Sequence, residues 1–281
     1  MCYEIISANY NNAKFLVAYF DSIINSTLKP SSIIIVDDCS QDNSVEIIRA
    51  YAKKINIKLI ENKINIGFAN SLNLALNKLE APFYARLDPD DQVHTDRFSK
   101  QIDFLSNNPE IDIVGSNVSY ILSGVLKKNS DVDIVEEEIN CNIRKGILPV
   151  IHGSIMGRTS KLNSFQYKQE FVPAEDYDFF AFSVANDLRV TNISDALTFV
   201  TIHENSVSND LKISTIKKRF ELAYFYFNYK KNLLALYLEY IHQLNYRRFL
   251  FESSLKKYLY LFYSASVMPK KSFKKTLKKV L

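Results

Sequence analysis

Three carboxylates crowd the end of a short β-prone run in "YARLDPDD", residues 84–91. Side chains two residues apart in an extended segment point to the same side, which would aim Asp88 and Asp90 at one point. Carboxylate oxygens are the hard ligands that magnesium and manganese prefer. The spacing therefore indicates a divalent-cation site. A turn followed by a helix cap is the alternative interpretation, because Asp and Pro are common turn residues.

The first hundred residues alternate between strand and helix patterns. Alternating or β-branched runs predict strands at 3–8, 31–38, 57–62 and 82–87, and one-sided apolar spacing predicts a helix after each. Such β-α units imply a mostly parallel sheet covered on both faces, with ligands bound outside the carboxyl ends of its strands. Because "VDDCS" and "LDPDD" both lie at such ends, the two acidic groups should line one crevice.

From about residue 111 the pattern becomes less regular. Residues 112–122 are predicted to form strand, turn and strand, and residues 150–158 a further strand. Residues 175–186 are predicted to form a helix and residues 187–203 a final pair of strands. This half is therefore expected to be a mixed α/β arrangement.

The composition is that of an ordinary globular protein: 281 residues, of which 47% are hydrophobic and 23% charged. Three scattered cysteines, Cys2, Cys39 and Cys141, favour free thiols in a reducing compartment over a disulfide framework. No basic region precedes the first apolar run, and no stretch approaches the roughly 18 apolar residues of a spanning helix. These features predict a cytoplasmic protein.

Charge divides the chain into two unlike parts. Residues 212–281 contain 16 Lys+Arg and 3 Asp+Glu, a balance of +13, which leaves 19 against 28 for residues 1–211, a balance of −9. This asymmetry predicts a domain boundary near residue 210. We expect a catalytic domain over 1–210 and a basic, aromatic-rich helical region over 211–281.

The phosphates of a nucleotide would need something other than a glycine cradle in this chain. The turn after the first strand, Ser7–Asn12, contains no glycine, and no Gly-Lys-Ser/Thr loop is present. A dinucleotide dehydrogenase or a P-loop enzyme is therefore not expected. A cation held by Asp88 and Asp90 is the obvious substitute, because it neutralises a diphosphate directly.

Several motifs in order make the chain similar to the family 2 glycosyltransferases. Ala8–Asn11 resembles the first-strand signature of that family, and "IIIVDDCSQDNS" its Val-Asp-Asp-Gly-Ser motif, with Cys39 in place of glycine. "NIGFANSLNLAL" resembles the Asn-x-Gly segment, "YARLDPDD" the metal motif, and "HGSIMGR" and "AEDYDFF" the acceptor-side motifs. The resemblance runs from about residue 4 to 205 and is greatest to bacterial enzymes that build capsule, exopolysaccharide or lipopolysaccharide chains. It implies an inverting enzyme with a GT-A fold, in which a Rossmann-like nucleotide half adjoins a mixed acceptor half.

The resemblance also implies a donor site. Asp38, with Asp37 beside it, would bind the base and ribose of a nucleotide sugar, and the family points to a uridine nucleotide. Ala8, Tyr10 and Asn65 lie in the matching donor-binding motifs, with Asp88 contributing from the metal motif. The alternative for the Asp-Asp pair is a cap on the following helix.

The resemblance further assigns Asp90 and Asp88 to a divalent cation, Mn²⁺ or Mg²⁺, and places His203 near the diphosphate or the metal. A histidine after a strand is also often structural. Relatives often have Arg two residues before this histidine, where this chain has Thr201.

Asp176 resembles the catalytic base of the family. It would take the proton from an acceptor hydroxyl as that oxygen attacks the anomeric carbon from the face opposite the leaving diphosphate. A carboxylate favoured by the dipole at a helix start is the alternative. The role of Glu175 stays open. Ser164–Tyr167 replaces a common Gly-Gly-Tyr, which leaves the shape of the acceptor site open too.

The C-terminal segment interleaves Lys and Arg with Tyr and Phe. No RNA- or DNA-binding motif accompanies it, so nucleic acid is not an expected partner. The pattern predicts two or three amphipathic helices, the last long one ending at Met268-Pro269. Their apolar faces pack on the catalytic domain in one interpretation. In the other, their basic faces meet the anionic inner leaflet of the cytoplasmic membrane, where a lipid-linked acceptor would be carried.

The sequence therefore predicts a metal-dependent glycosyltransferase that moves a sugar from a nucleotide donor to a growing bacterial surface glycan. A nucleotidyltransferase is one alternative, although it would be expected to show a Gly-rich basic loop near the N-terminus. A non-catalytic, glycosyltransferase-like binding subunit is the other. Asp38, Asp88, Asp90 and Asp176 argue against that reading.

Overall fold

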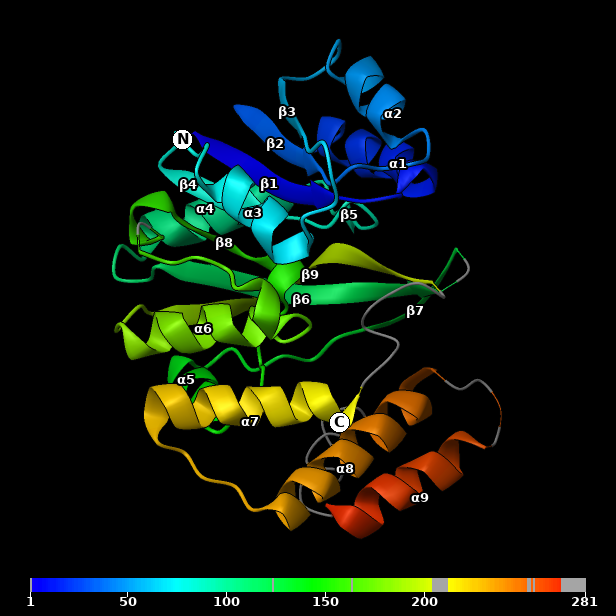
Figure 1. The fold of residues 1–281 in the computed structure, drawn as a ribbon, viewed down its shortest axis with the longest axis vertical. Coiled ribbons are helices and arrows are strands. Elements are labelled where there is room, and N and C mark those ends of the chain that lie inside the picture. The colour runs from blue at the N-terminus through cyan, green and yellow to red at the C-terminus, as the bar shows by residue number, and fades with distance from the viewer. Residues whose placement is uncertain are drawn as a thin grey trace. The chain divides into compact units, whose positions relative to one another are not determined.

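The computed structural model of the chain (Figure 1) describes residues 2–122, 124–162, 164–203, 212–251, 254 and 256–268. Two compact units are present, Met1–His203 and Glu204–Leu281. Residue 210, where the charge pattern predicts a boundary, lies outside the described residues.

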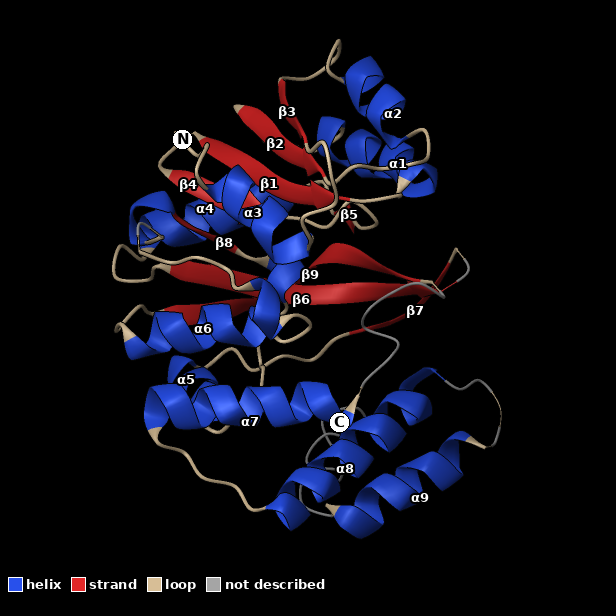
Figure 2. Ribbon diagram, viewed as in Figure 1, coloured by secondary structure: helices blue, strands red, loops and turns tan. Residues whose placement is uncertain are grey.

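Four parallel strands form the first half of the sheet, in the order β3-β2-β1-β4. They are β1 (Tyr3–Asn9), β2 (Ser32–Asp37), β3 (Ile57–Glu61) and β4 (Phe83–Arg86). The helices that follow them are α1 (Ala13–Ile24), α2 (Ser44–Tyr51), α3 (Phe68–Leu76) and α4 (Arg97–Asn107). Every strand and helix predicted for this half is confirmed, and Figure 2 shows α3 crossing one face of the sheet.

Burial of the strands on both faces explains why this half follows its sequence pattern so closely. All residues of β1 and β2 are buried, and Leu16, Phe20 and Phe98 from α1 and α4 join their core. Since the strands are parallel, their carboxyl ends meet at one edge. The loops after β1, β2 and β4 therefore lie along that edge.

The second half of the sheet differs from the prediction at both of its long strands. β6 (Ile113–Leu122) and β9 (Val190–Ile202) are each one continuous strand, where strand pairs were predicted. They run parallel to each other, and β8 (Met156–Arg158) joins β6 to β4 by antiparallel pairing. The strand predicted at 150–158 is shorter because residues His152–Ser154 form a 3-10 turn. The remaining elements are β5 (Gln92–Val93), β7 (Val125–Asn129), α5 (Glu136–Arg144) and the predicted helix α6 (Glu175–Ala185).

The apparent turn signals inside β6 and β9 have other causes. Gly115 stands within β6 because a Cβ at that position would collide with the side chain of Asn192 on β9. Ser194, Asp195 and Leu197 are extra residues of a β-bulge, where the register between β6 and β9 shifts on both sides of Asn117. A glycine required by close packing and a bulge both resemble turns in a single sequence.

The C-terminal unit consists, in its described part, of α7 (Ile213–Phe227), α8 (Leu233–Phe251) and α9 (Lys257–Val267). Ile216, Phe220 and Leu236 form a small buried cluster between α7 and α8. The helical prediction for this region is confirmed over these residues, and α9 stops just before Met268. Within the part of the chain that the structure describes, no helix has the length and apolar character to cross a bilayer.

Candidate active site

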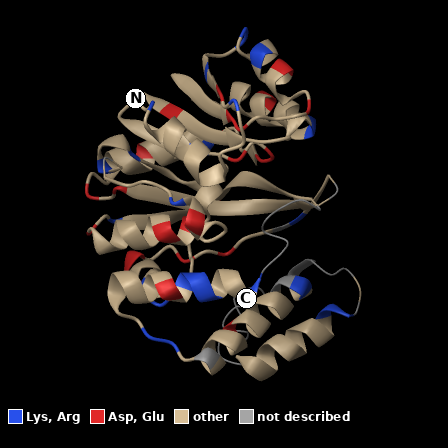
Figure 3. Ribbon diagram, in the orientation of Figure 1, with Lys and Arg blue, Asp and Glu red and all other residues tan. Residues whose placement is uncertain are grey.

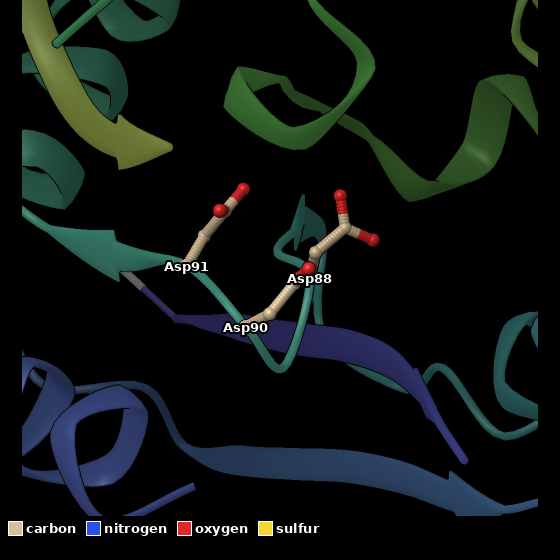
Figure 4. Close-up of side chains that lie close together, drawn as sticks. All are labelled: Asp88, Asp90 and Asp91. Atoms are coloured by element: carbon tan, nitrogen blue, oxygen red, sulfur yellow. The ribbon is translucent and has the colours of Figure 1, made fainter. Parts of the chain in front are cut away.

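An acidic turn, which comprises Asp88, Asp90 and Asp91, follows β4 at the carboxyl edge of the sheet. Its start is held by hydrogen bonds between Leu87 and residues 6 and 7 of β1, at 3.3 and 2.6 Å. Carboxylate oxygens of the three aspartates lie within 4.8 Å of one another, and Figure 4 shows the side chains leaving one turn. Asp88 and Asp90 converge as predicted. They do so through a turn rather than an extended segment, and the turn adds Asp91.

Negative charge is only partly compensated in the acidic turn. Arg86 contacts the Asp88 carboxylate through both Nη atoms, with Nη1 donating at 2.5 Å. Burial raises the pKa of Asp88 to about 6; Asp90 adds to the rise, and Arg86 opposes it. The pKa of Asp91 is raised well above its usual value by burial and by the charges of Asp90 and Asp88. The turn therefore holds more negative charge than its surroundings neutralise.

His203, directly after the end of β9, lies beside the acidic turn. Its Nε2 lies 2.9 Å from Asp90 Oδ2, and its ring lies 4.6 Å from the ring of Phe15 on α1. The Thr201 amide donates to Asp91 Oδ1 at 2.9 Å. The structure thus places His203 beside the acidic turn. Thr201, at the position where relatives often carry Arg, contacts the acidic turn through its backbone amide.

Arg86 is buried at the centre of this site. The Phe68 ring at the start of α3 lies 5.6 Å from its guanidinium carbon. The backbone at Gly153 approaches from the other side, so closely that a Cβ there would lie 3.2 Å from both Arg86 Nη1 and Asp88 Oδ2. Glycine at this position lets the "HGS" turn pack directly on the ion pair.

The Asp37–Asp38 pair after β2 is bonded by its own chain. Asp37 accepts hydrogen bonds from Asn9 Nδ2 at 2.8 Å and from the amide and hydroxyl of Ser40 at 2.9 and 2.6 Å. Asp38 accepts from Asn62 Nδ2 and from the amides of residues 66 and 67, at 2.8 to 2.9 Å. Both side chains are buried. The pair does not cap α2, which begins later at Ser44, so the capping alternative is wrong.

The other predicted donor residues lie along the same loops. Ala8 is buried in β1 opposite Val36, so only its backbone is available to a ligand. Tyr10 follows it with its ring exposed, and Asn65 is exposed in the loop between Asn62 and α3. The structure therefore groups Tyr10 and Asn65 with the loops that the Asp37–Asp38 pair organises.

The predicted base stands in the first turn of α6. Asp176 Oδ1 accepts a hydrogen bond from the Tyr177 amide at 2.6 Å. Glu175 Oε2 is buried and has no hydrogen-bond partner among the described residues. Burial, followed by the charge of Asp176, raises the pKa of Glu175 to about 7, while Arg86 opposes the rise. The negative charge of Asp88 also contributes to the raised pKa of Glu175.

Comparison with known proteins decides the family. Residues 4–165 match the model described as Glycosyl transferase family 2. The chain belongs to this family. It is 31% identical over 227 residues to an uncharacterized glycosyltransferase of Methanocaldococcus jannaschii, covering 79% of this chain and 77% of that one. It is 29% identical over 210 residues to the Escherichia coli protein WfaP, a UDP-Glc:alpha-D-GlcNAc-diphosphoundecaprenol beta-1,3-glucosyltransferase, covering 73% and 79%.

Solved structures confirm the GT-A fold of the glycosyltransferase. Residues 1–349 of Staphylococcus aureus TarS in complex with UDP-GlcNAc align with a TM-score of 0.67 at 20% identity, over 95% of this chain and 80% of that one. A mannosyltransferase from Pyrobaculum calidifontis in complex with GDP-Man and Mn²⁺ aligns with a TM-score of 0.60 at 15% identity, over 99% and 79%. At such identities the likeness concerns the fold alone.

In this glycosyltransferase a strap, residues 167–171, ties α3 to the segment that leads into α6. Asn73 on α3 bonds both backbone groups of Tyr167, donating to its carbonyl and accepting from its amide at 2.8 Å each. Gln169 Oε1 accepts from the Ala69 amide at 3.1 Å. The Tyr167 hydroxyl lies 2.7 Å from Nε2 of buried His152, whose pKa is lowered by burial and by Arg86. The strap thus connects the nucleotide half to the "HGS" turn.

Sequence reasoning assigned no role to four residues of this glycosyltransferase site. Arg86 and Asp91 stand in the motif "YARLDPDD" itself, and a basic residue inside a buried strand was the available signal for Arg86. Gly153 gave a weaker signal, since isolated glycines have many causes. Asn73 gave none, because its partner lies 94 residues further along the chain.

Proposed function

We propose that this glycosyltransferase moves a sugar from a nucleoside diphosphate donor to a growing bacterial surface glycan, with inversion at the anomeric carbon. The donor class is a uridine diphosphate sugar, and the acceptor is a glycan or a lipid-linked glycan. The name of WfaP includes a UDP-Glc donor and a diphosphoundecaprenol-linked acceptor, and TarS was solved with UDP-GlcNAc. Three free cysteines support a reducing compartment, so we propose that the reaction occurs in the cytoplasm.

The acidic turn is the observation that carries the proposal. Three carboxylates lie close together in this turn, and the pKa of two of them is raised. Such a cluster destabilises the folded protein unless a cation binds to it. Oxygen-rich clusters of this kind suit Mn²⁺ or Mg²⁺. The residues therefore fit a divalent cation, with Asp88 and Asp90 as its ligands and His203 beside Asp90. When bound, the cation would stabilise the charge that develops on the leaving diphosphate.

The first turn of α6 supplies the proton acceptor in this proposal. Asp176 would remove the proton from the acceptor hydroxyl as the new bond forms between its oxygen and the anomeric carbon. The bond from that carbon to the diphosphate breaks, and the electron pair leaves with the diphosphate. The helix dipole favours a charged carboxylate at this position. Glu175, whose pKa is about 7, is the neighbouring candidate that the experiments must separate from it.

A donor screen tests the proposed function. Release of nucleoside diphosphate is measured across a panel of nucleotide sugars, with manganese, with magnesium and with chelator, in the presence of lipid-linked acceptors. We expect release with one uridine diphosphate sugar and loss of that release in chelator. Binding of a nucleotide sugar without any release would favour a non-catalytic subunit. Release of pyrophosphate from a nucleoside triphosphate and a sugar phosphate would instead identify a nucleotidyltransferase.

A further inference from the structure

The C-terminal unit exposes apolar side chains to an extent that the catalytic unit does not. Of the 16 large hydrophobic side chains that are exposed among the described residues, nine belong to 212–268, although this unit is by far the smaller. The nine are Ile213, Tyr224, Phe225, Leu234, Tyr237, Tyr258, Leu259, Phe262 and Tyr263. Isolated exposed hydrophobic residues are normal, but a concentration on a few short helices marks an interaction surface.

Helix α9 shows the feature most sharply because it is apolar on two sides, with Tyr260, Leu261 and Val267 partly buried on the inward side. Tyr258, Leu259, Phe262 and Tyr263 share one side of the helix at helical spacing, and they are 52% to 67% exposed. On the opposite side Ser264 is fully buried, and its hydroxyl lies 2.9 Å from Nδ1 of buried His242 on α8. A surface helix normally directs its apolar stripe into the core. Here a second apolar stripe faces outward.

Positive charge accompanies these rings. Lys257 lies over the Tyr258 ring at 5.2 Å and Lys230 over the Tyr224 ring at 5.5 Å. Both described acidic residues of the unit are engaged by its own lysines: Glu221 by Lys217 and Lys218, and Glu239 by Lys231. Figure 3 shows the resulting excess of basic positions on α7, on α8 and in the segment that joins them. The exposed surface is therefore aromatic and cationic together.

We propose that this surface, the outward side of α9 formed by Tyr258, Leu259, Phe262 and Tyr263, binds the face of an anionic phospholipid bilayer. Tyrosine has an apolar body and a polar tip, and basic side chains extend their charge past apolar surface, so both suit the level of lipid headgroups. None of the described helices is long and apolar enough to span a membrane, so the mode is surface attachment. The inference concerns the C-terminal unit alone and holds whichever sugar the catalytic unit transfers.

A bilayer fits this surface better than a second copy of the chain. A two-fold interface pairs a patch with itself, which would bring Lys257 at the start of α9 toward the same lysine of the other copy. Like charges at an interface oppose association. Anionic headgroups instead attract basic side chains near the surface.

Absence of tryptophan from the chain provides a direct test. In the full-length protein, Phe262→Trp introduces a single indole on the outward side of α9, and Leu126→Trp introduces one at an exposed position of β7 as the matched control. Each variant is mixed with vesicles of phosphatidylcholine, with or without phosphatidylglycerol. We expect the emission of the α9 probe to shift to the blue with the anionic vesicles only, and to return when salt is raised. The β7 probe should not shift.

Co-flotation with vesicles supplies the second measurement. Leu259→Ser combined with Phe262→Ser should weaken binding to anionic vesicles at least about tenfold, since burial of even one such side chain is worth more than that factor. Both side chains are exposed, so the variant should keep its circular dichroism and melting temperature. Leu126→Ser should bind like the parent. Binding of the double variant at parental strength would overturn the proposal, as would a folded parent that ignores anionic vesicles at low salt. A dimer that this variant abolishes, in a protein that ignores vesicles, would assign the surface to a second copy.

Discussion

The loops after β2 and β4 each carry a group of carboxylates, and the same fold treats the two groups in opposite ways. Asp37 and Asp38 are buried, and each accepts three hydrogen bonds from its own chain. The acidic turn instead packs three carboxylates together, with the pKa of Asp88 and Asp91 raised by burial and by one another. The Asp37–Asp38 pair is therefore saturated with hydrogen bonds, whereas the acidic turn is electrostatically strained because its negative charges repel one another.

This contrast separates carboxylates that build a site from those that await a ligand. Donors that surround a buried carboxylate stabilise its charge and fix the loops that supply them. A crowded group with few donors destabilises the fold until a cation binds, after which the same charges become favourable. Loss of a charge should therefore have opposite effects on stability in the two groups, and only the acidic turn should respond to metal.

The largest effect is expected from removing a carboxylate of the acidic turn. Asp90→Ala should abolish cation-dependent donor binding, and Asp88→Ala should weaken it in the same direction, because the cation loses a charged oxygen ligand. Calorimetry with the nucleotide sugar, with manganese and then with chelator, measures this. Asp103→Ala, on the exposed side of α4, is the control and should bind like the parent. Unchanged donor affinity in both variants would contradict a metal site at the acidic turn.

A third pair of carboxylates, Glu175 and Asp176, extends the comparison to the chemical step. Asp176→Asn should bind donor normally and transfer sugar at least about a hundredfold more slowly, the usual scale for a lost general base. Glu175→Gln mimics the protonated form that a pKa of about 7 makes common near neutral pH, so it should lose less. Single-turnover transfer rates in the two variants decide the assignment. The reverse ranking would make Glu175 the base.

The sign of the stability change tests the contrast itself. Asp38→Asn should lower the free energy of unfolding by about 2–3 kcal/mol, because an amide cannot accept all of the hydrogen bonds that the carboxylate receives. Asp91→Asn should raise the free energy of unfolding in chelator, because it removes a charge that burial disfavours. Denaturation of both variants by urea in chelator gives the comparison. A destabilising Asp91→Asn would show that the acidic turn is saturated after all.

The sequence predicted the surroundings of the Asp37–Asp38 pair better than those of the acidic turn. Both depend on strand ends in a buried parallel sheet, which the β-branched runs mark clearly. The hydrogen bonds to Asp38 come from the next loop, residues 62–67, and so belong to a local unit. Gly153 and His203 reach the acidic turn from distant segments, Gly153 from the turn before β8 and His203 from the end of β9. The bulge in β9 conceals the continuity of that strand, so nothing local in the sequence showed that Gly153 and His203 meet at the acidic turn.

The pH dependence of stability should also separate the two groups. Asp88 has a pKa of about 6 in the folded chain, above its ordinary value of 3.8. A raised carboxyl pKa contributes stability that is fully present below pH 3.8 and is lost as the pH rises through 6. In chelator, the unfolding free energy of the parent should therefore fall across this window relative to Asp88→Asn. Saturating manganese should reduce or reverse the difference. Parallel curves for the two proteins would contradict the raised pKa.

The smallest predicted effect concerns backbone strain in the loop that carries the Asp37–Asp38 pair. Cys39, directly after Asp38, has a φ of 67°, in the left-handed region that most side chains avoid and glycine adopts freely. Cys39→Gly should therefore raise the free energy of unfolding by up to about 1 kcal/mol, since the gain from relieved strain exceeds the added freedom of the unfolded chain.

Cys141 provides the matched control for that substitution. It is exposed within helix α5, so Cys141→Gly should lower stability by about 0.5–1 kcal/mol, because glycine is unfavourable in a helix. Urea denaturation of the two variants then measures one chemical change in two backbone conformations. Destabilisation at both positions would mean that the hydrogen-bond donors around Asp37 and Asp38 hold the loop without strain at Cys39. Opposite signs would show that the loop tolerates an unfavourable backbone angle in order to bring those donors onto the carboxylates.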